Sequence, residues 1–161
     1  MLTIRVIFEQ MRFGFLLILL LWGFTATAAG LFGSSADTLK PKHFRLVGNA
    51  GLHLTAYSGT LVLLNQAWYK DYPKASFHTF NDSKEWNQVD KSGHAWTAYS
   101  LSRASYRSWK WAGLSERQAA ITGAASGFAF MTVIEFLDAH SAEWGWSWAD
   151  MAANTLGSGL F

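Results

Sequence analysis

The sequence predicts an all-α protein: a small antiparallel helical bundle, embedded in a membrane and preceded by a signal or anchor helix. Half of the 161 residues are apolar and only 15% are charged, against about 25% charged in ordinary soluble domains. There are only two prolines, and apolar stretches of helical length recur between capping and stop signals. There is no cysteine, which excludes disulfides, thiolate metal sites and acylation of a lipoprotein-type cysteine.

The N-terminus has the composition of a targeting segment. Arg5 and Arg12 precede the apolar run FGFLLILLLWGF, and an Ala-x-Ala pattern ends at Ala28. This order is typical of a secretory signal peptide, and the run is short for a spanning helix, which needs about 20 apolar residues. We predict that residues 1–28 are a signal peptide or an N-terminal anchor, and either would direct the chain to the bacterial cell envelope. Residues 29–42 are small and polar, and are predicted to be a linker.

The folded domain is predicted to occupy residues 43–161. Its first helix, over 44–69, is apolar but carries polar side chains, which suits a helix that faces other protein on one side. A polar and aromatic connection follows over 70–89. Within it, DSKE has the spacing of a capping box, so a short helix is predicted near 83–88.

A helical hairpin comes next. The second helix is predicted over 90–112, because Gly113 fits the left-handed stop position. The third is predicted over 116–138, with SERQ as its capping box, and its GAASG segment puts small residues on one face, which favours close helix packing. A fourth helix, over 147–161, is still running at the last residue, so we expect the chain to be truncated at its C-terminus.

Polar side chains of three predicted helices converge at one end of the bundle. Asp90 and His94 lie 24 and 20 residues before the hairpin turn at Leu114. Asp138 and Glu135 lie 24 and 21 residues after it. Antiparallel helices of equal rise place such residues at matching depths, so the sequence predicts a polar pocket at this end. The fourth helix starts there with Ser147, Asp150 and Asn154.

Each of these residues also has an explanation that needs no function. The two aspartates that begin helices suit caps, and His94 suits a hydrogen-bonded histidine. Lys91 is expected to be a solvated or interfacial charge that pairs with Glu135 or Asp138. Glu135 is the hardest to explain in this way, because it follows the apolar run FAFMTVI, where an acid is costly unless it is paired or functional.

Three segments are distinctive: NQAWYKDYP, FHTFNDSKEWNQVDKSGHAWTAY and EFLDAHSAEWGWSWADMAANTLGS. Over about residues 43–161 the chain resembles an uncharacterised bacterial family typified by YfiM and described as predicted periplasmic lipoproteins. The pattern D-K-x-x-H-x(4)-Y, then an acid, then S-x-x-D-x-x-A-N-x-x-G, is similar to VanZ-like membrane proteins, which are linked to glycopeptide resistance. The residues that carry it are Asp90, Lys91, His94, Tyr99, Glu135, Ser147, Asp150, Asn154 and Gly157.

The resemblance implies an envelope location and a pocket shared by the family, and it implies no reaction. The chain departs from the lipoprotein description, because it has no cysteine to carry an acyl chain. Together, the spacing and the resemblance predict a set of binding residues. They are Asp90, Lys91, His94, Tyr99, Glu135, Asp138, Ser147, Asp150 and Asn154.

Three classes of function stay open. The first is a membrane-embedded binding protein for a lipid or lipid-linked envelope precursor, with the head group in the pocket. The second is a hydrolase or transferase on such a lipid, with His94 as base and Glu135 and Asp90 as further catalytic candidates. It could instead use His94, Glu135, Asp138 and Asp150 as hard metal ligands, which is a thin set with a single histidine. The third is a purely structural bundle. No HExxH-type motif, nucleophile elbow or phosphate loop occurs, so binding or structural roles are favoured, and neither a metal nor a cofactor is predicted.

The expected partner is a membrane lipid or lipid-linked precursor, since a net charge of +2 is too small to indicate nucleic acid. Tryptophans in the loops at the pocket end indicate an interfacial aromatic belt. The predicted location is the inner membrane or the periplasmic face of a membrane. Basic residues at the other end favour the cytoplasm for that end, whereas a cleaved signal would place the start of the domain outside. Both orientations, and the oligomeric state, stay open.

Overall fold

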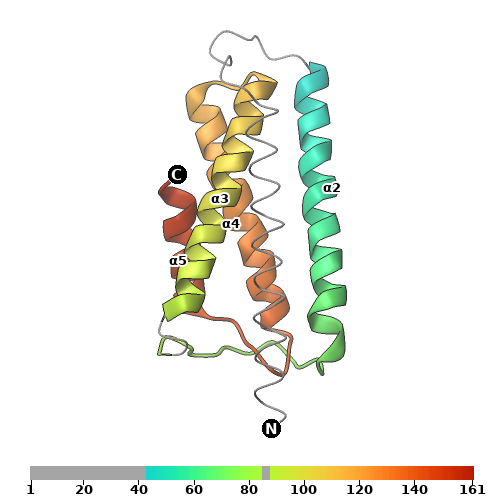
Figure 1. The fold of residues 1–161 in the computed structure, drawn as a ribbon, viewed down its shortest axis with the longest axis vertical. Coiled ribbons are helices and arrows are strands. Elements are labelled where there is room, and N and C mark those ends of the chain that lie inside the picture. Colours follow the sequence, from blue (N-terminus) through green and yellow to red (C-terminus); the bar gives the residue numbers. More distant parts are fainter. Residues whose placement is uncertain (1–42, 85–87) are drawn as a thin grey trace. The chain divides into compact units, whose positions relative to one another are not determined.

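The computed structural model describes residues 43–84 and 88–161, all of which belong to one compact unit of the chain. Four α-helices lie alongside one another in this unit (Figure 1), and a short 3-10 helix, η2, follows the first of them. No strand forms among the residues described, so the predicted all-α bundle is confirmed. The elements are α2 (His43–Ala67), η2 (Tyr69–Asp71), α3 (Val89–Ala112), α4 (Glu116–Asp138) and α5 (Trp148–Gly159).

Some predictions fall on residues that the structure does not describe. The signal or anchor segment over 1–28 and the linker over 29–42 lie wholly outside the described residues, and the short helix near 83–88 lies partly outside them. The division of the chain at residue 43 therefore stays a prediction.

Local signals set the helix ends. Ser115 Oγ accepts a hydrogen bond from the Gln118 N–H at 3.3 Å, and Gln118 Oε1 accepts one from the Ser115 N–H at 3.2 Å. This capping box starts α4 at the predicted residue. Gly113 ends α3 in the left-handed conformation, with φ 101°. The last helix is shorter than predicted, because α5 ends at Gly159 and does not run on to Phe161.

Glycines bring α4 and α5 against α3. A Cβ atom on Gly127 would lie 2.9 Å from the carbonyl oxygen of Ala98, and one on Gly123 would lie 2.8 Å from that of Ser102. The close approach predicted for the GAASG segment is therefore present. Gly157 of α5 packs equally closely against α3, because a Cβ atom added to it would lie 2.8 Å from the carbonyl carbon of Ala95 and closer still to the oxygen.

Helix α2 turns polar side chains toward the rest of the bundle. Asn49, His53 and Tyr57 recur every fourth residue and so share one face. His53 Nε2 lies 3.0 Å from Ser105 Oγ of α3, and the Tyr57 hydroxyl lies 2.8 Å from Ser126 Oγ of α4. The large apolar side chains of α2 point outward instead. Phe44, Val47, Leu54, Val62 and Leu63 are each more than half exposed.

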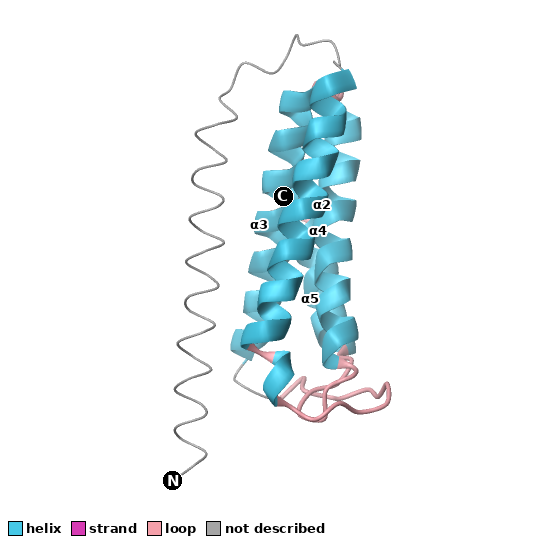
Figure 2. Ribbon diagram, turned by 90° about the vertical axis from the view of Figure 1, so that its right-hand side faces the viewer, coloured by secondary structure: helices cyan, strands magenta, loops and turns pink. Residues whose placement is uncertain are grey.

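Two loops close one end of the bundle (Figure 2). Residues 72–84 and 139–147 pair through backbone hydrogen bonds and isolated bridges. The Phe80 N–H donates to the carbonyl of Trp146 at 2.9 Å, and the Trp146 N–H donates to the carbonyl of His78 at 2.9 Å. This pairing carries the end of each loop to the starts of α3 and α5, where the predicted pocket lies.

Candidate functional site

Charged and polar side chains gather where the two loops meet the helices. The group, called here the acidic–histidine site, combines the starts of α3 and α5, the last turn of α4 and the loop before α3. Asp90 and His94 are four residues apart and share a face of α3, while α4 runs antiparallel and brings its last turn to the same depth. The members are Asp82, Asp90, Lys91, His94, Glu135, Ser147, Asp150 and Asn154.

One side of the His94 ring faces two buried oxygen acceptors. His94 Nδ1 lies 3.2 Å from Asn154 Oδ1 and 3.4 Å from Glu135 Oε1. Glu135 is 1% exposed and Asn154 is fully buried. The other Glu135 oxygen accepts a hydrogen bond from the backbone N–H of Ser147 at 3.2 Å. A proton on Nδ1 has Asn154 Oδ1 as its nearest acceptor.

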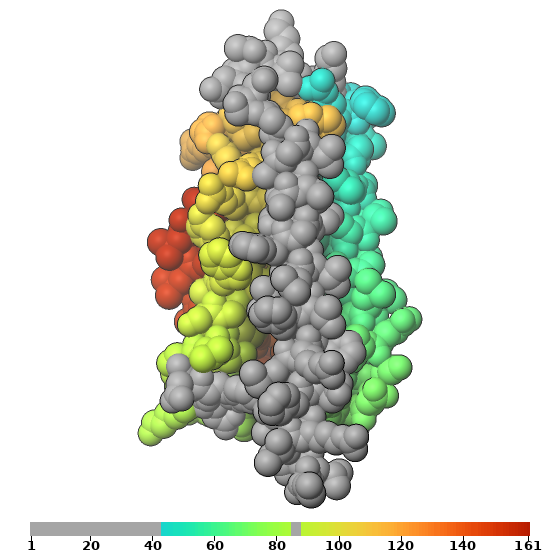
Figure 3. Space-filling model, in the orientation of Figure 1, coloured from blue at the N-terminus to red at the C-terminus, as the bar shows by residue number. Residues whose placement is uncertain are grey.

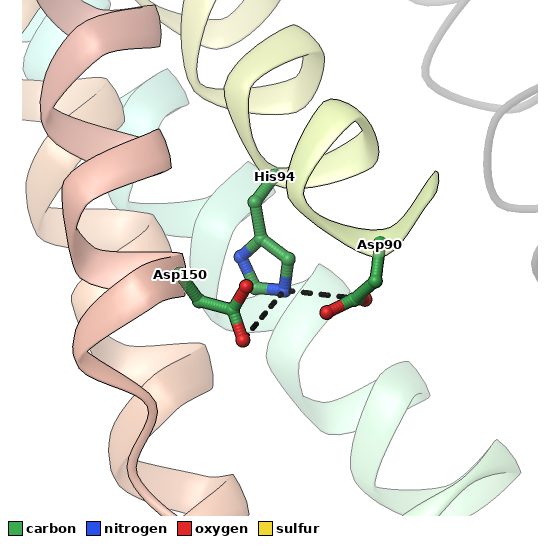
Figure 4. A group of neighbouring side chains, drawn as sticks. All are labelled: Asp90, His94 and Asp150. Carbon is green, nitrogen blue, oxygen red and sulfur yellow. Dashed lines mark ion pairs between the residues drawn. The ribbon is translucent and has the colours of Figure 1, made fainter. Parts of the chain in front are cut away.

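The other side of the ring faces two aspartates. Figure 4 shows Asp90 from α3 and Asp150 from α5 turned toward His94 Nε2. Asp90 Oδ1 lies 3.8 Å from Nε2 and Asp150 Oδ2 lies 4.0 Å from it. Asp150 is buried, whereas the Asp90 side chain is 44% exposed. The ring therefore lies between carboxylates on both of its nitrogen sides.

Lys91 holds three of the aspartates together. Its Nζ lies 2.8 Å from Asp90 Oδ2, 2.8 Å from Asp150 Oδ1, and forms a shorter ion pair with Asp82. The Lys91 side chain is only 11% exposed. The predicted pairing of Lys91 with Glu135 or Asp138 is wrong, because the side chain extends from the first turn of α3 toward the preceding loop and the start of α5.

The pKa values of Asp150 and Asp82 are shifted in opposite directions. Burial raises the pKa of Asp150 to about 6, although the nearby His94 and the hydrogen bond from Lys91 oppose the rise. Burial also acts to raise the pKa of Asp82, but hydrogen bonds from Lys91 and Ser147 outweigh it and hold that pKa below its usual value. Ser147 Oγ donates to Asp82 Oδ1 at 2.7 Å. Asp82 therefore stays ionised and anchors the lysine.

Two predicted binding residues face elsewhere. Asp138 Oδ1 accepts a hydrogen bond of 2.6 Å from the Tyr69 hydroxyl, so it binds η2 at the edge of the site. Tyr99 accepts a hydrogen bond from Arg103 at 2.7 Å and stacks on Trp96 with ring centroids 6.2 Å apart. The prediction that Tyr99 lines the pocket is wrong, because Tyr99 is five residues beyond His94 and lies about 140° further round the helix.

Sequence reasoning missed Asp82 as a member of the site. We interpreted it as the first residue of a capping box, but Asn81 Oδ1 accepts the hydrogen bonds from the Ser83 N–H and Oγ in this turn. The signal that could have found Asp82 is Lys91 itself. A lysine in the first turn of a helix that packs into a bundle needs carboxylate partners, and Asp82 lies in the loop just before it.

The fold and the site define the class: a helical bundle with a buried acidic–histidine site at one end. Residues 79–161, more than half of the chain, match the model of a family described as predicted periplasmic lipoproteins (DUF2279), and the chain belongs to this family. The description supports the predicted bacterial cell-envelope location. No curated protein and no solved structure matches the chain. The links to YfiM-like and VanZ-like proteins stay predictions.

Proposed function

We propose that the bundle is embedded in a membrane of the bacterial envelope and that the acidic–histidine site binds the polar head of a lipid or lipid-linked precursor. One observation carries the proposal: the largest fully buried side chains of the described residues are polar, while many large apolar side chains face outward. Soluble proteins bury Leu, Ile, Phe and Val. Among the residues described, the four largest fully buried side chains are polar, namely Glu135, Asn154, Ser102 and Ser147, while Leu101, Phe130 and Met131 are buried slightly less completely.

The outer surface supports membrane embedding. Large apolar side chains of α2, α4 and α5 face outward, and Figure 3 shows α2, from cyan to green, along one flank of this surface. Among the described residues, α4 is the one helix long and apolar enough to cross a membrane by length and composition. Small and polar residues between helices with apolar residues outside are typical of membrane bundles.

The position of the site supports head-group binding. Aromatic side chains gather in the loops beside it: Trp144 lies against Trp68 and Tyr72, and Trp146 packs edge-on against Trp148, which is 70% exposed. Such aromatic residues favour the membrane–water interface, which is the level of lipid head groups. A polar site at this end of an embedded bundle would meet a head group, while the chains of the lipid would lie along the apolar outer surface.

Membrane embedding is tested by extraction. Membranes from cells that express the full chain are washed with alkaline carbonate, which strips peripheral proteins. We expect the chain to stay in the membrane pellet and to be released by detergent. Release into the carbonate supernatant would rule out an embedded bundle.

Head-group binding is tested by titration. The full chain in detergent is titrated with a polyprenyl phosphate, once in the presence of MnCl₂ and once in the presence of EDTA. Binding is followed by the fluorescence of the tryptophans that lie beside the site. We expect saturable binding that weakens at least tenfold in His94→Gln and is unchanged in His43→Ala, since His43 is exposed at the far end of α2. Equal affinity in both variants would show that this site does not bind the head group.

A further inference from the structure

The acidic–histidine site poses a problem of charge. Within the described part of the chain, the carboxyl groups of Asp82, Asp90, Glu135 and Asp150 lie against two basic side chains, Lys91 and His94. A phosphate-bearing head group would be repelled by such a surface unless a further cation lay between them. The arrangement of the ligand atoms shows where that cation would bind.

We propose that Asp90, His94 and Asp150 bind a divalent metal cation, and that this cation presents free coordination positions to an anionic lipid head group. Metal binding itself does not depend on the proposed function, whereas the contact with a head group rests on it. The ligand atoms would be His94 Nε2 and one oxygen of each aspartate.

The first argument is convergence. One ligand atom from each of the three residues lies within 4.8 Å of the other two. The distances from His94 Nε2 to Asp90 Oδ1 and Asp150 Oδ2 are 3.8 and 4.0 Å. A four-coordinate ion with bonds of about 2.1 Å holds its ligands about 3.4 Å apart. Each aspartate therefore has to close by about half an ångström, and the partly exposed Asp90 side chain is free to do so.

The second argument is the tautomer of His94. A metal-binding histidine donates its other ring N–H to an oxygen acceptor, which fixes the ring and leaves a lone pair for the metal. His94 Nδ1 faces Asn154 Oδ1 and Glu135 Oε1, so in the tautomer with its proton on Nδ1 the ring can donate to these oxygens. The lone pair of Nε2 then points at two carboxylates. Three acceptors face one another, which is the arrangement a cation satisfies.

The third argument comes from buried atoms beside the ring. Glu135 Oε1 has no hydrogen-bond partner within the described part of the chain that meets full geometric criteria, and it is buried beside His94 Nδ1. A cation on Nε2 would polarise the ring and strengthen the Nδ1–H donor toward this oxygen. The metal would thus strengthen the 3.4 Å contact between His94 Nδ1 and this buried oxygen.

Lys91 would support the metal from outside. It contacts Asp90 Oδ2 and Asp150 Oδ1, whereas His94 Nε2 faces the other oxygen of each aspartate. Each aspartate can therefore bridge the lysine and the metal with different oxygens. One imidazole nitrogen with two carboxylate oxygens suits a borderline or hard ion, so Zn²⁺ and Mn²⁺ are the appropriate probes.

The test measures metal binding without lipid. The full chain in detergent is freed of metal with EDTA, and Zn²⁺ and Mn²⁺ are titrated by calorimetry. We expect one ion per chain, at least tenfold weaker binding in Asp90→Asn and in His94→Gln, and unchanged binding in His43→Ala. Asp90→Asn is the key variant, because its partly exposed side chain can be changed without opening the interior.

A second measurement protects the result against misfolding. In ¹⁵N spectra of histidine-labelled protein, Zn²⁺ should shift Nε2 of the one ring whose signal is missing in His94→Gln. Absence of binding to the wild type, or equal loss in His43→Ala, would overturn the proposal and leave Lys91 as the cation of the site. Metal binding without polyprenyl phosphate binding would reject the proposed function but not the metal site. Polyprenyl phosphate binding without metal binding would reject the metal site but not the proposed function.

Discussion

Gly157 is expected to control the position of α5, and with it half of the site. In Gly157→Ala the new Cβ would lie 2.8 Å from the carbonyl carbon of Ala95, whereas ordinary contact begins at 3.4 Å. The clash is with backbone, so no side chain can move aside. Helix α5 therefore has to shift by more than half an ångström, and Asn154, one turn earlier on α5, has to move away from His94 with it.

The matched control is Gly159→Ala, two residues further along α5, where a Cβ meets nothing within 4 Å. Alanine is favoured over glycine in a helix by up to about 1 kcal/mol, so this variant should be neutral or slightly stabilised. Overpacking against backbone costs about 1–3 kcal/mol, so Gly157→Ala should be less stable than Gly159→Ala by about that amount. Thermal unfolding in detergent, followed by circular dichroism, measures both. Equal stability of the two variants would refute the packing described for α5.

Two further predictions concern the ionisable groups. Burial raises the pKa of Asp150 from 3.8 to about 6, so the folded state binds the proton more tightly than the unfolded state does. Protonation of Asp150 therefore stabilises the fold fully below about pH 4, and this stabilisation is lost as the pH rises through 6. With EDTA present, Asp150 should contribute a loss of up to about 3 kcal/mol over that window to the unfolding free energy of the wild type. Asp150→Asn should therefore lose less stability over the window than the wild type, and parallel stability profiles of the two proteins would contradict the burial effect. His94→Ala and Glu135→Ala should each cost about 1–3 kcal/mol, and the double variant should cost less than the sum because the two side chains are in contact; additive losses would show that they do not interact.

Helix boundaries could be predicted because their causes are local. Ser115 and Gln118 complete a capping box within four residues, and Gly113 supplies the left-handed stop at the position where α3 ends. The depth of Glu135 opposite His94 followed from counting residues on each side of one short turn. These signals depend on the spacing of neighbours along a helix, and they need no knowledge of the rest of the fold.

The partners within the site could not be predicted in the same way. Which carboxylates Lys91 reaches depends on how the loop before α3 folds back, and that path is set by its pairing with residues 139–147. This path of the loop is what brings Asp82 next to Lys91 in the site. Tyr99 lies outside the site, because the rotation of the helix, rather than the place of a residue in a motif, decides which face its side chain occupies.

For the part of the chain that the structure describes, the sequence by itself determined an all-helical fold, the limits of most of its helices, and the end of the bundle where its acids and histidine meet. Periodicity, capping and residue counts are sufficient for this, because each acts over a few residues or along one rigid helix. Only the tertiary structure decided that α5 packs against α3 through Gly157 and that His94 lies between Glu135 and Asp150. These contacts join residues about 40 to 60 positions apart, and their geometry depends on how whole helices rotate and approach one another.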